Sequence, residues 1–249
     1  MKTLMDIPYS DIGHKNQVLD IFLPEAESFP VFVYFHGGGL EEGDQHNPPF
    51  VEYLTSKGIA VVSAQYRMYP TAKYPEFIMD AAAAVAWSMK HLGEYGDCKR
   101  FYVGGSSAGA YLSMMLCFDR RWLAPYGMAP GDIAGFVHDA GQPTKHFHIC
   151  REEGLDTRRV IIDDTAPIYH VGTSGQYPPM LFMVSDDDME NRYEQTLLMV
   201  STLRHFAYDM DKIELHVTHG GHCISLQMTD EAGDNVFAKT VYAFMEKNQ

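Results

Sequence analysis

The chain has 249 residues, of which 46% are hydrophobic, and this length suits one large α/β domain or two small ones. Its 33 acidic and 19 basic residues give a formal net charge of −14. This charge argues against nucleic acid or an anionic membrane as a partner, because both bind basic patches. No stretch approaches the roughly 18 apolar residues of a membrane span, and residues 1–8 lack a secretory signal pattern.

The predicted elements alternate between apolar strands and amphipathic or alanine-rich helices. This alternation predicts an α/β fold with a mostly parallel central sheet and helices on both faces. Because no linker or internal repeat interrupts it, we expect a single domain over residues 1–249. In chain order, the expected elements are a strand at 18–23, a strand at 31–35, a helix at 50–56, a strand at 59–64, a helix at 77–92, a strand at 101–103, a helix at 108–118, strands at 133–137 and 180–184, a helix at 190–206, a strand at 213–217 and a helix at 235–246.

One segment interrupts this alternation of strands and helices. Residues 142–164 lie between two predicted strands, show no clear period and carry several charged side chains. A long irregular insertion in an α/β domain often covers the functional site. We therefore expect a short cap or lid at 142–164.

The cysteines give no sign of a disulfide framework or a zinc site. They are widely scattered and none forms a CxxC pair, so reduced thiols and a cytoplasmic location are expected. The run His146-x-His148-x-Cys150 has metal-binding residue types, but it lies in the irregular segment without a second cluster. We therefore expect neither a metal nor another cofactor. The cysteines are Cys98, Cys117, Cys150 and Cys223.

The most informative motif is Gly105-Ser106-Ser107-Ala108-Gly109, which follows a predicted strand and opens a predicted helix. A G-x-S-x-G sequence in this context places a reactive serine on a sharp strand-to-helix turn. The frame centred on Ser107 has glycine at both required positions, whereas the frame centred on Ser106 has only the first. Ser107 is therefore the expected nucleophile.

A second motif, His36-Gly37-Gly38-Gly39, follows the predicted strand at 31–35. A serine that attacks a carbonyl creates an oxyanion, which needs unshielded backbone N–H donors. Gly37 and Gly38 can provide two of them, and Ala108, the residue after the nucleophile, can provide a third. His36 is expected to brace the loop.

A serine nucleophile also needs a base and a carboxylate that orients this base. The strand at 180–184 leads into Ser185 and three aspartates, and the acid is expected three positions after the small residue, at Asp188, with Asp187 as the alternative. The strand at 213–217 leads into two histidines. His222 follows a Gly-Gly turn that gives it room to reach the serine, so we expect it to be the base, with His219 as the alternative.

Taken in series, these motifs resemble the carboxylesterases of the α/β-hydrolase fold, close to the hormone-sensitive-lipase-like and the acetyl-ester or xylan esterase-like branches. Ser106 stands where the hormone-sensitive-lipase-like enzymes commonly have aspartate, and Ala110 where they have glycine, which favours the smaller esterases. Further matching segments are Tyr66-Arg67-Met68-Tyr69-Pro70, Tyr74-Pro75 with Asp80, residues 166–171, and Pro178-Pro179.

This resemblance implies a metal-independent serine hydrolase that cleaves short-chain carboxylic esters, acetyl esters of carbohydrates among them, through an acyl-enzyme. The partner would be a small-molecule ester, and a homodimer remains an open alternative. Two other functions stay open. The same triad could cleave amides, as an arylformamidase or a peptidase does, and the same fold could serve a non-catalytic binding protein.

Overall fold

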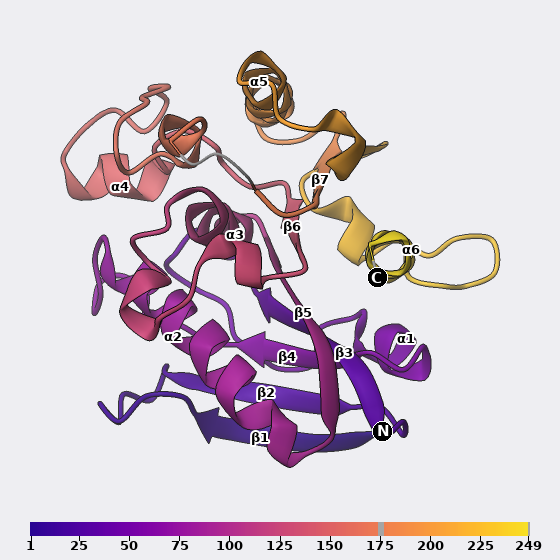
Figure 1. Cartoon of the computed structure of the whole chain (residues 1–249). Helices are drawn as coiled ribbons and strands as arrows, with labels where there is room; N and C mark the ends of the chain where they lie inside the picture. Colours follow the sequence, from indigo (N-terminus) through magenta and orange to yellow (C-terminus); the bar gives the residue numbers. More distant parts are fainter. Residues whose placement is uncertain (174–176, 249) are drawn as a thin grey trace.

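The computed structural model describes residues 1–173 and 177–248, and these form a twisted sheet flanked by helices (Figure 1). Among the described residues, eight strands pair in the order β1-β2-β4-β3-β5-β6-β7-β8. From β4 to β8 all neighbours pair in parallel, whereas β2 pairs antiparallel with both β1 and β4. The strands are β1 (Lys2–Pro8), β2 (Val18–Leu23), β3 (Ser28–Phe35), β4 (Ala60–Ala64), β5 (Asp97–Ser106), β6 (Gly135–Asp139), β7 (Met180–Ser185) and β8 (Ile213–Thr218).

Helices cover both faces of the sheet, so the predicted α/β fold class is confirmed. Along β3, Val33 and Phe35 enter the core on one face, while Phe32 and Tyr34 enter the core on the other. Helices α2, α3 and α5 pack on the first face, and α1 and α6 on the second. The longer helices are α1 (Val51–Ser56), α2 (Glu76–His91), α3 (Ala108–Phe118), α4 (Phe147–Glu152), α5 (Arg192–His205) and α6 (Val236–Lys247).

Two elements were absent from the sequence-based prediction. Strand β1 is mostly exposed, with only Leu4 and Ile7 partly buried, so it has no apolar run to reveal it. Its extended form comes from pairing with β2, which is a tertiary effect. Helix α4 has six residues, too few to establish a helical period.

The insertion at 142–164 has two different halves. Most of residues 142–150 are buried, whereas most of residues 151–164 are exposed. The buried half is tied to the body by the Thr144 hydroxyl, which donates to the Gln195 side chain at 2.8 Å. Lys145 then joins the two halves through ion pairs with Glu153 at 2.6 Å and Asp163 at 2.7 Å. The outer half is thus exposed but tied to the buried half, and a lid at 142–164 stays a prediction.

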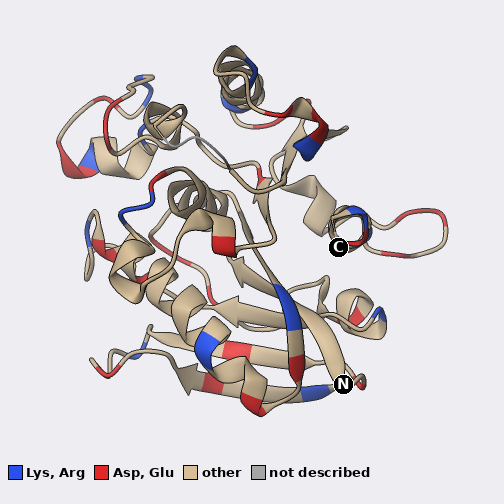
Figure 2. Ribbon diagram, viewed as in Figure 1, with Lys and Arg blue, Asp and Glu red and all other residues tan. Residues whose placement is uncertain are grey.

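The charge of the protein is distributed over many elements. In the ribbon of Figure 2, acidic residues (red) occur along the sheet, the helices and the loops, with Lys and Arg (blue) scattered among them. In the described part of the chain, no helix is long and apolar enough to cross a membrane.

A buried ion pair joins α2 to the loop after β4. The Asp80 carboxylate, 2% exposed, accepts hydrogen bonds from Arg67 Nε and Nη2, both at 2.8 Å, and from the Arg67 backbone N–H at 2.9 Å. Gln17 Nε2 adds a fourth bond at 2.8 Å. Since both oxygens are satisfied, Asp80 can be buried as a charge.

We expect Asp80→Ala to lower the free energy of unfolding by about 3 kcal/mol, because it leaves the guanidinium of Arg67 without its buried partner. Urea denaturation measures this change. The control is Glu76→Gln, which removes the more exposed partner of the same arginine and should cost less than about 1 kcal/mol. Equal losses from the two variants would contradict the assignment of Asp80 as the anchor.

Candidate active site

Ser107 lies on a strained turn between β5 and α3. Its φ of 54° and ψ of −114° fall in a region that non-glycine residues rarely adopt. Two hydrogen bonds hold this conformation: the Ser107 N–H donates to the Asp139 carbonyl at 2.7 Å, and the Ser107 carbonyl accepts from the Tyr111 N–H at 3.1 Å. The side chain is thereby presented above the carboxyl ends of the parallel strands.

The two glycines of the motif allow backbone segments to approach closely. A Cβ on Gly109 would lie 1.9 Å from the Phe35 carbonyl oxygen, and a Cβ on Gly105 would lie 2.4 Å from the Gly109 carbonyl carbon. Neither space accepts even a methyl group, because the obstructing atoms are backbone. These contacts hold the start of α3 against the end of β3, where the His36-Gly37-Gly38-Gly39 loop begins.

The structure brings Ser107, His222 and Asp188 into one chain of hydrogen bonds. His222 Nε2 lies 2.8 Å from Ser107 Oγ, and His222 Nδ1 lies 2.5 Å from Asp188 Oδ1. Because a carboxylate can only accept, Nδ1 carries the proton, and Nε2 is left free to accept from the serine hydroxyl. The three residues follow β5, β8 and β7, so parallel strand ends place them together.

The Asp188 side chain has no solvent exposure, yet its environment favours the charged form. Burial raises the pKa of this carboxyl, but the hydrogen bond from His222 and the bond from the Met189 N–H outweigh that effect and lower the pKa overall. A permanent negative charge therefore faces Nδ1 of His222, which fixes the orientation of the imidazole ring.

The alternative acid and base from the sequence analysis, Asp187 and His219, do not lie in the hydrogen-bond chain of Ser107. His219 is 94% exposed and lies 2.9 Å from Asp186, to which it can form a surface ion pair. Asp187 is exposed and uses its backbone N–H to donate to the Gly220 carbonyl at 3.2 Å. These contacts hold the loops after β7 and β8 together and leave Asp188 and His222 as the inner pair.

The glycine loop after β3 lies against the serine turn. A Cβ on Gly37 would lie 3.2 Å from the Ser107 Cβ, and Gly38 has a φ of +103° that a larger residue would rarely adopt. Within the described residues, the backbone N–H groups of Gly37, Gly38 and Ala108 donate no hydrogen bond. Donors in this state are available to a ligand, which is the property an oxyanion site requires.

His36 is held inside this loop. Its Nδ1 lies 2.6 Å from the Gly37 carbonyl, its Nε2 lies 2.6 Å from Gln65 Oε1, and its ring stacks on Tyr66 at 4.6 Å. Burial lowers the pKa of His36, so the ring is neutral near pH 7. These contacts are those of a structural brace.

One cluster among the described residues has a metal-binding composition. Atoms of Asp6, Asp20 and His46 lie within 4.8 Å of one another. A hydrogen bond to Asp20 raises the pKa of His46 and so favours its protonated form, which competes with metal binding. The cluster belongs to β1, β2 and the loop after β3, and it contains none of the residues around Ser107.

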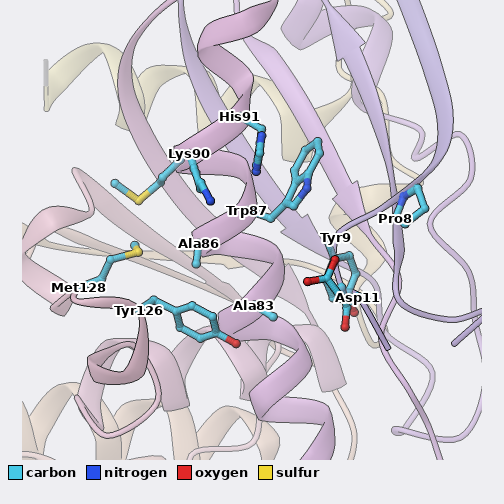
Figure 3. Close-up of a pocket in the computed structure, with 12 residues that line it drawn as sticks. Pro8, Tyr9, Asp11, Ala83, Ala86, Trp87, Lys90, His91, Tyr126 and Met128 are labelled. Atoms are coloured by element: carbon cyan, nitrogen blue, oxygen red, sulfur yellow. The ribbon is translucent and has the colours of Figure 1, made fainter. Parts of the chain in front are cut away.

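Two cavities lie outside the Ser107 group, and neither is lined by Ser107, His222 or Asp188. A cavity of about 1010 Å³ lies between α2 and the residues after β1, with Trp87, His91, Tyr126 and Asp11 among its lining (Figure 3), and it includes no residue of the Ser107 group. A smaller cavity of about 240 Å³ adjoins the acid-bearing loop. It is lined by Gln142, Phe147, Thr157, Arg158, Arg159, Met189, Glu190, Asn191, Arg192 and Gln195.

The model of the BD-FAE family matches residues 19–122 of the chain. It is 33% identical over 132 residues to carboxylesterase NlhH of Mycobacterium tuberculosis, a match that covers 47% of this chain and 41% of the relative. The chain therefore spans less than half the length of that relative. The chain has the α/β-hydrolase fold and resembles the carboxylesterases.

Solved structures support this fold assignment. Esterase B from Lactobacillus rhamnosis, with a tributyrin phosphonate inhibitor, superposes with a TM-score of 0.79 at 17% identity, over 100% of this chain and 89% of the other. A truncated carbohydrate esterase from gut microbiota superposes with a TM-score of 0.76 at 16% identity, over 100% and 96%. At such identities the likeness establishes the α/β-hydrolase fold alone.

One residue beside the serine turn was not singled out from the sequence. Asp139 ends β6, pairs in register with Ser106 and is 2% exposed. A single aspartate at a strand end carries no motif, so its position beside the serine turn becomes visible only in the folded chain.

Substituting Gly109 should disturb the serine turn. We expect Gly109→Ala to destabilise the fold by about 3 kcal/mol or more, because the new methyl group overlaps the Phe35 carbonyl. Thermal and urea unfolding measure the loss. Gly131→Ala is the matched control, since a Cβ there meets no atom within 4 Å. A Gly109→Ala variant as stable as Gly131→Ala would contradict the close backbone approach.

Proposed function

We propose that the protein is a serine esterase that hydrolyses short-chain carboxylic esters through an acyl-enzyme intermediate. The hydrogen-bond chain from Ser107 through His222 to Asp188 carries this proposal. The similarity to carboxylesterases supports an ester, rather than an amide, as the bond that is cleaved. Ser107 is the proposed nucleophile, His222 the base and Asp188 the residue that orients the base.

In the first half-reaction, the Ser107 oxygen attacks the ester carbonyl carbon while its proton passes to His222 Nε2. The resulting imidazolium is stabilised by the buried Asp188 carboxylate at its other nitrogen. Collapse of the tetrahedral intermediate breaks the bond to the alcohol oxygen, and His222 returns the proton to this leaving group. The acyl group then remains on Ser107.

The second half-reaction repeats these steps with water. His222 takes a proton from a water molecule, whose oxygen attacks the acyl carbon, and then returns the proton to Ser107 as the acid leaves. In both halves the carbonyl oxygen becomes negative, and the N–H groups of Gly37, Gly38 and Ala108 are the proposed donors to it. The loss of one such donor typically raises a barrier by about 3 kcal/mol.

The small cavity beside the acid-bearing loop suits a polar alcohol better than a long lipid chain. Arg158, Arg159 and Gln142 contribute polar groups to its lining, together with the aromatic ring of Phe147. A Cβ on Gly39 would lie 3.3 Å from Phe147, so this ring connects the cavity to the glycine loop. A short acyl ester of a carbohydrate fits these features, and a carbohydrate esterase shares the fold.

The organisation expected from the sequence forms part of the proposal. We infer a single domain over residues 1–249, with the outer half of 142–164 as a lid over the substrate. The free thiols among the described residues agree with a cytoplasmic protein. A homodimer is a further proposal, which size-exclusion chromatography with light scattering tests.

We expect Ser107→Ala to reduce the turnover of p-nitrophenyl acetate by about 10⁴-fold or more, because the acyl-enzyme can no longer form. A fluorophosphonate should label the wild-type protein at Ser107, as mass spectrometry of the peptides would show. Ser106→Ala is the matched control and should keep the label. Turnover by Ser107→Ala at the wild-type rate, or a label on Ser106, would refute the assignment.

The two histidines after β8 provide a further test. His222→Ala should reduce turnover of the same ester by about 10³-fold or more, since the serine loses its base. His219→Ala removes an exposed ring and should leave the rate near that of the wild type. If His219→Ala caused the larger loss, the outer pair of Asp186 and His219 would have to replace the inner pair in the mechanism.

A further inference from the structure

The small cavity beside the acid-bearing loop is cationic, although the protein as a whole is strongly acidic. Its lining contains one acidic residue, Glu190, and three basic ones, which are Arg158, Arg159 and Arg192. The whole chain has a formal net charge of −14, and a protein field of that sign repels anionic substrates. Three arginines gathered in one cavity reverse this field locally.

Arg192 is a buried cation without an acidic partner. It is the first residue of α5 and is 4% exposed. Its Nη1 donates to the Ala140 carbonyl at 2.7 Å, and its Nη2 donates to Gln142 Oε1 at 3.4 Å, so both acceptors are neutral. Among the described residues, Asp188 acts on Arg192 only through space, and its carboxylate is already bonded to His222. A guanidinium stays charged, and a buried charge without an ionic partner is costly.

The two other arginines of the cavity differ in what they bind. Arg158 is exposed and pairs with Asp156, with its Nη2 2.7 Å from Oδ2 and its Nε 3.0 Å from Oδ1. The Arg159 side chain is also exposed, but it forms no hydrogen bond or ion pair with any residue that the structure describes. Arg159 and Arg192 are thus available to a ligand. The planar guanidinium matches a carboxylate with two parallel hydrogen bonds, so a carboxylate is the ligand that this pair suits best.

The cavity adjoins the proposed triad without including it. Met189 and Glu190, which line the cavity, directly follow Asp188 in the chain. In the proposed mechanism His222 protonates the leaving alcohol, so this alcohol lies on the side of the His222–Asp188 pair. A group carried by the alcohol can therefore occupy the cavity while the ester carbonyl lies at Ser107.

We propose that Arg192 and Arg159 bind a carboxylate on the alcohol part of the substrate, so that the enzyme prefers acyl esters of hydroxy acids or sugar acids to esters of neutral alcohols. This inference rests on the proposed function and specifies its substrate class. The carboxylate supplies the ionic partner that Arg192 lacks within the described part of the chain. Arg159 adds an exposed cation, and neither arginine takes part in proton transfer.

The test compares p-acetoxybenzoate with p-acetoxybenzamide, two acetyl esters of nearly the same shape that differ in charge. We expect the wild-type kcat/KM to be about tenfold or more higher for the carboxylate, mainly through a lower KM. Arg192→Met keeps the length of the side chain and removes its charge. This variant should lose most of the preference by raising KM for p-acetoxybenzoate, while kcat/KM for p-acetoxybenzamide stays within about threefold of the wild type. Arg192→Lys restores a charge and should recover part of the preference.

Arg204→Met is the matched control, since it removes an exposed arginine from the last turn of the same helix, outside the cavity, and should keep the preference. Equal kcat/KM values for the two esters in the wild type would overturn the inference. An Arg192→Met variant that loses both activities equally would also overturn it, because such a loss marks a structural role.

If Arg192→Met does not fold, inhibition of wild-type p-nitrophenyl acetate hydrolysis decides. Stronger competitive inhibition by p-hydroxybenzoate than by p-hydroxybenzamide supports the inference, and equal inhibition overturns it. Hydrolysis of p-nitrophenyl acetate without any preference for the carboxylate would leave the proposed function in place. No hydrolysis of any of these esters would reject the proposed function and the inference with it.

Discussion

The contact on which the site depends is the one between Gly109 and the carbonyl of Phe35. This contact leaves no room for a side chain at Gly109. The backbone at the start of α3 therefore packs directly against the backbone at the end of β3. The serine turn and the glycine loop are thereby placed side by side at the point where the chain crosses from one half of the sheet to the other. Binding sites of open α/β sheets lie at such crossover points.

The sequence was sufficient to predict the α/β fold class and the residues that meet at Ser107. Glycines at fixed spacing and small residues before the acid and the base are local signals of turns, and turns at parallel strand ends converge. Strand β1 and helix α4 escaped prediction, since β1 depends on its pairing with β2 and α4 is too short to show a period. The burial of Asp139 could not be foreseen, because it depends on the pairing of β6 with β5 and β7 in the folded chain.

In the sequence, a single cue favoured Asp188 over Asp187, its position three residues after Ser185, and the structure brings the Asp188 side chain to His222. Adjacent aspartates in one loop have almost identical sequence environments, and only the path of the backbone decides which side chain turns inward. Asp186 faces the exposed His219, and Asp188 faces His222. Two histidine–aspartate pairs thus bridge the same two loops, one at the surface and one inside.

The strands that carry the site residues are aligned by continuous register: Ser106 is opposite Asp139, Asp139 is opposite Met183, and Ser185 is opposite Thr218. A slip of β8 by one residue would displace the loop that bears His222 by about 3.3 Å, which is more than a hydrogen bond tolerates. A compact chain with misaligned strands would keep its helices and its sheet and yet have no working base. Reactivity at Ser107 therefore depends on the correct register of the strands. Spectroscopic measures of secondary-structure content would not detect a change in that register.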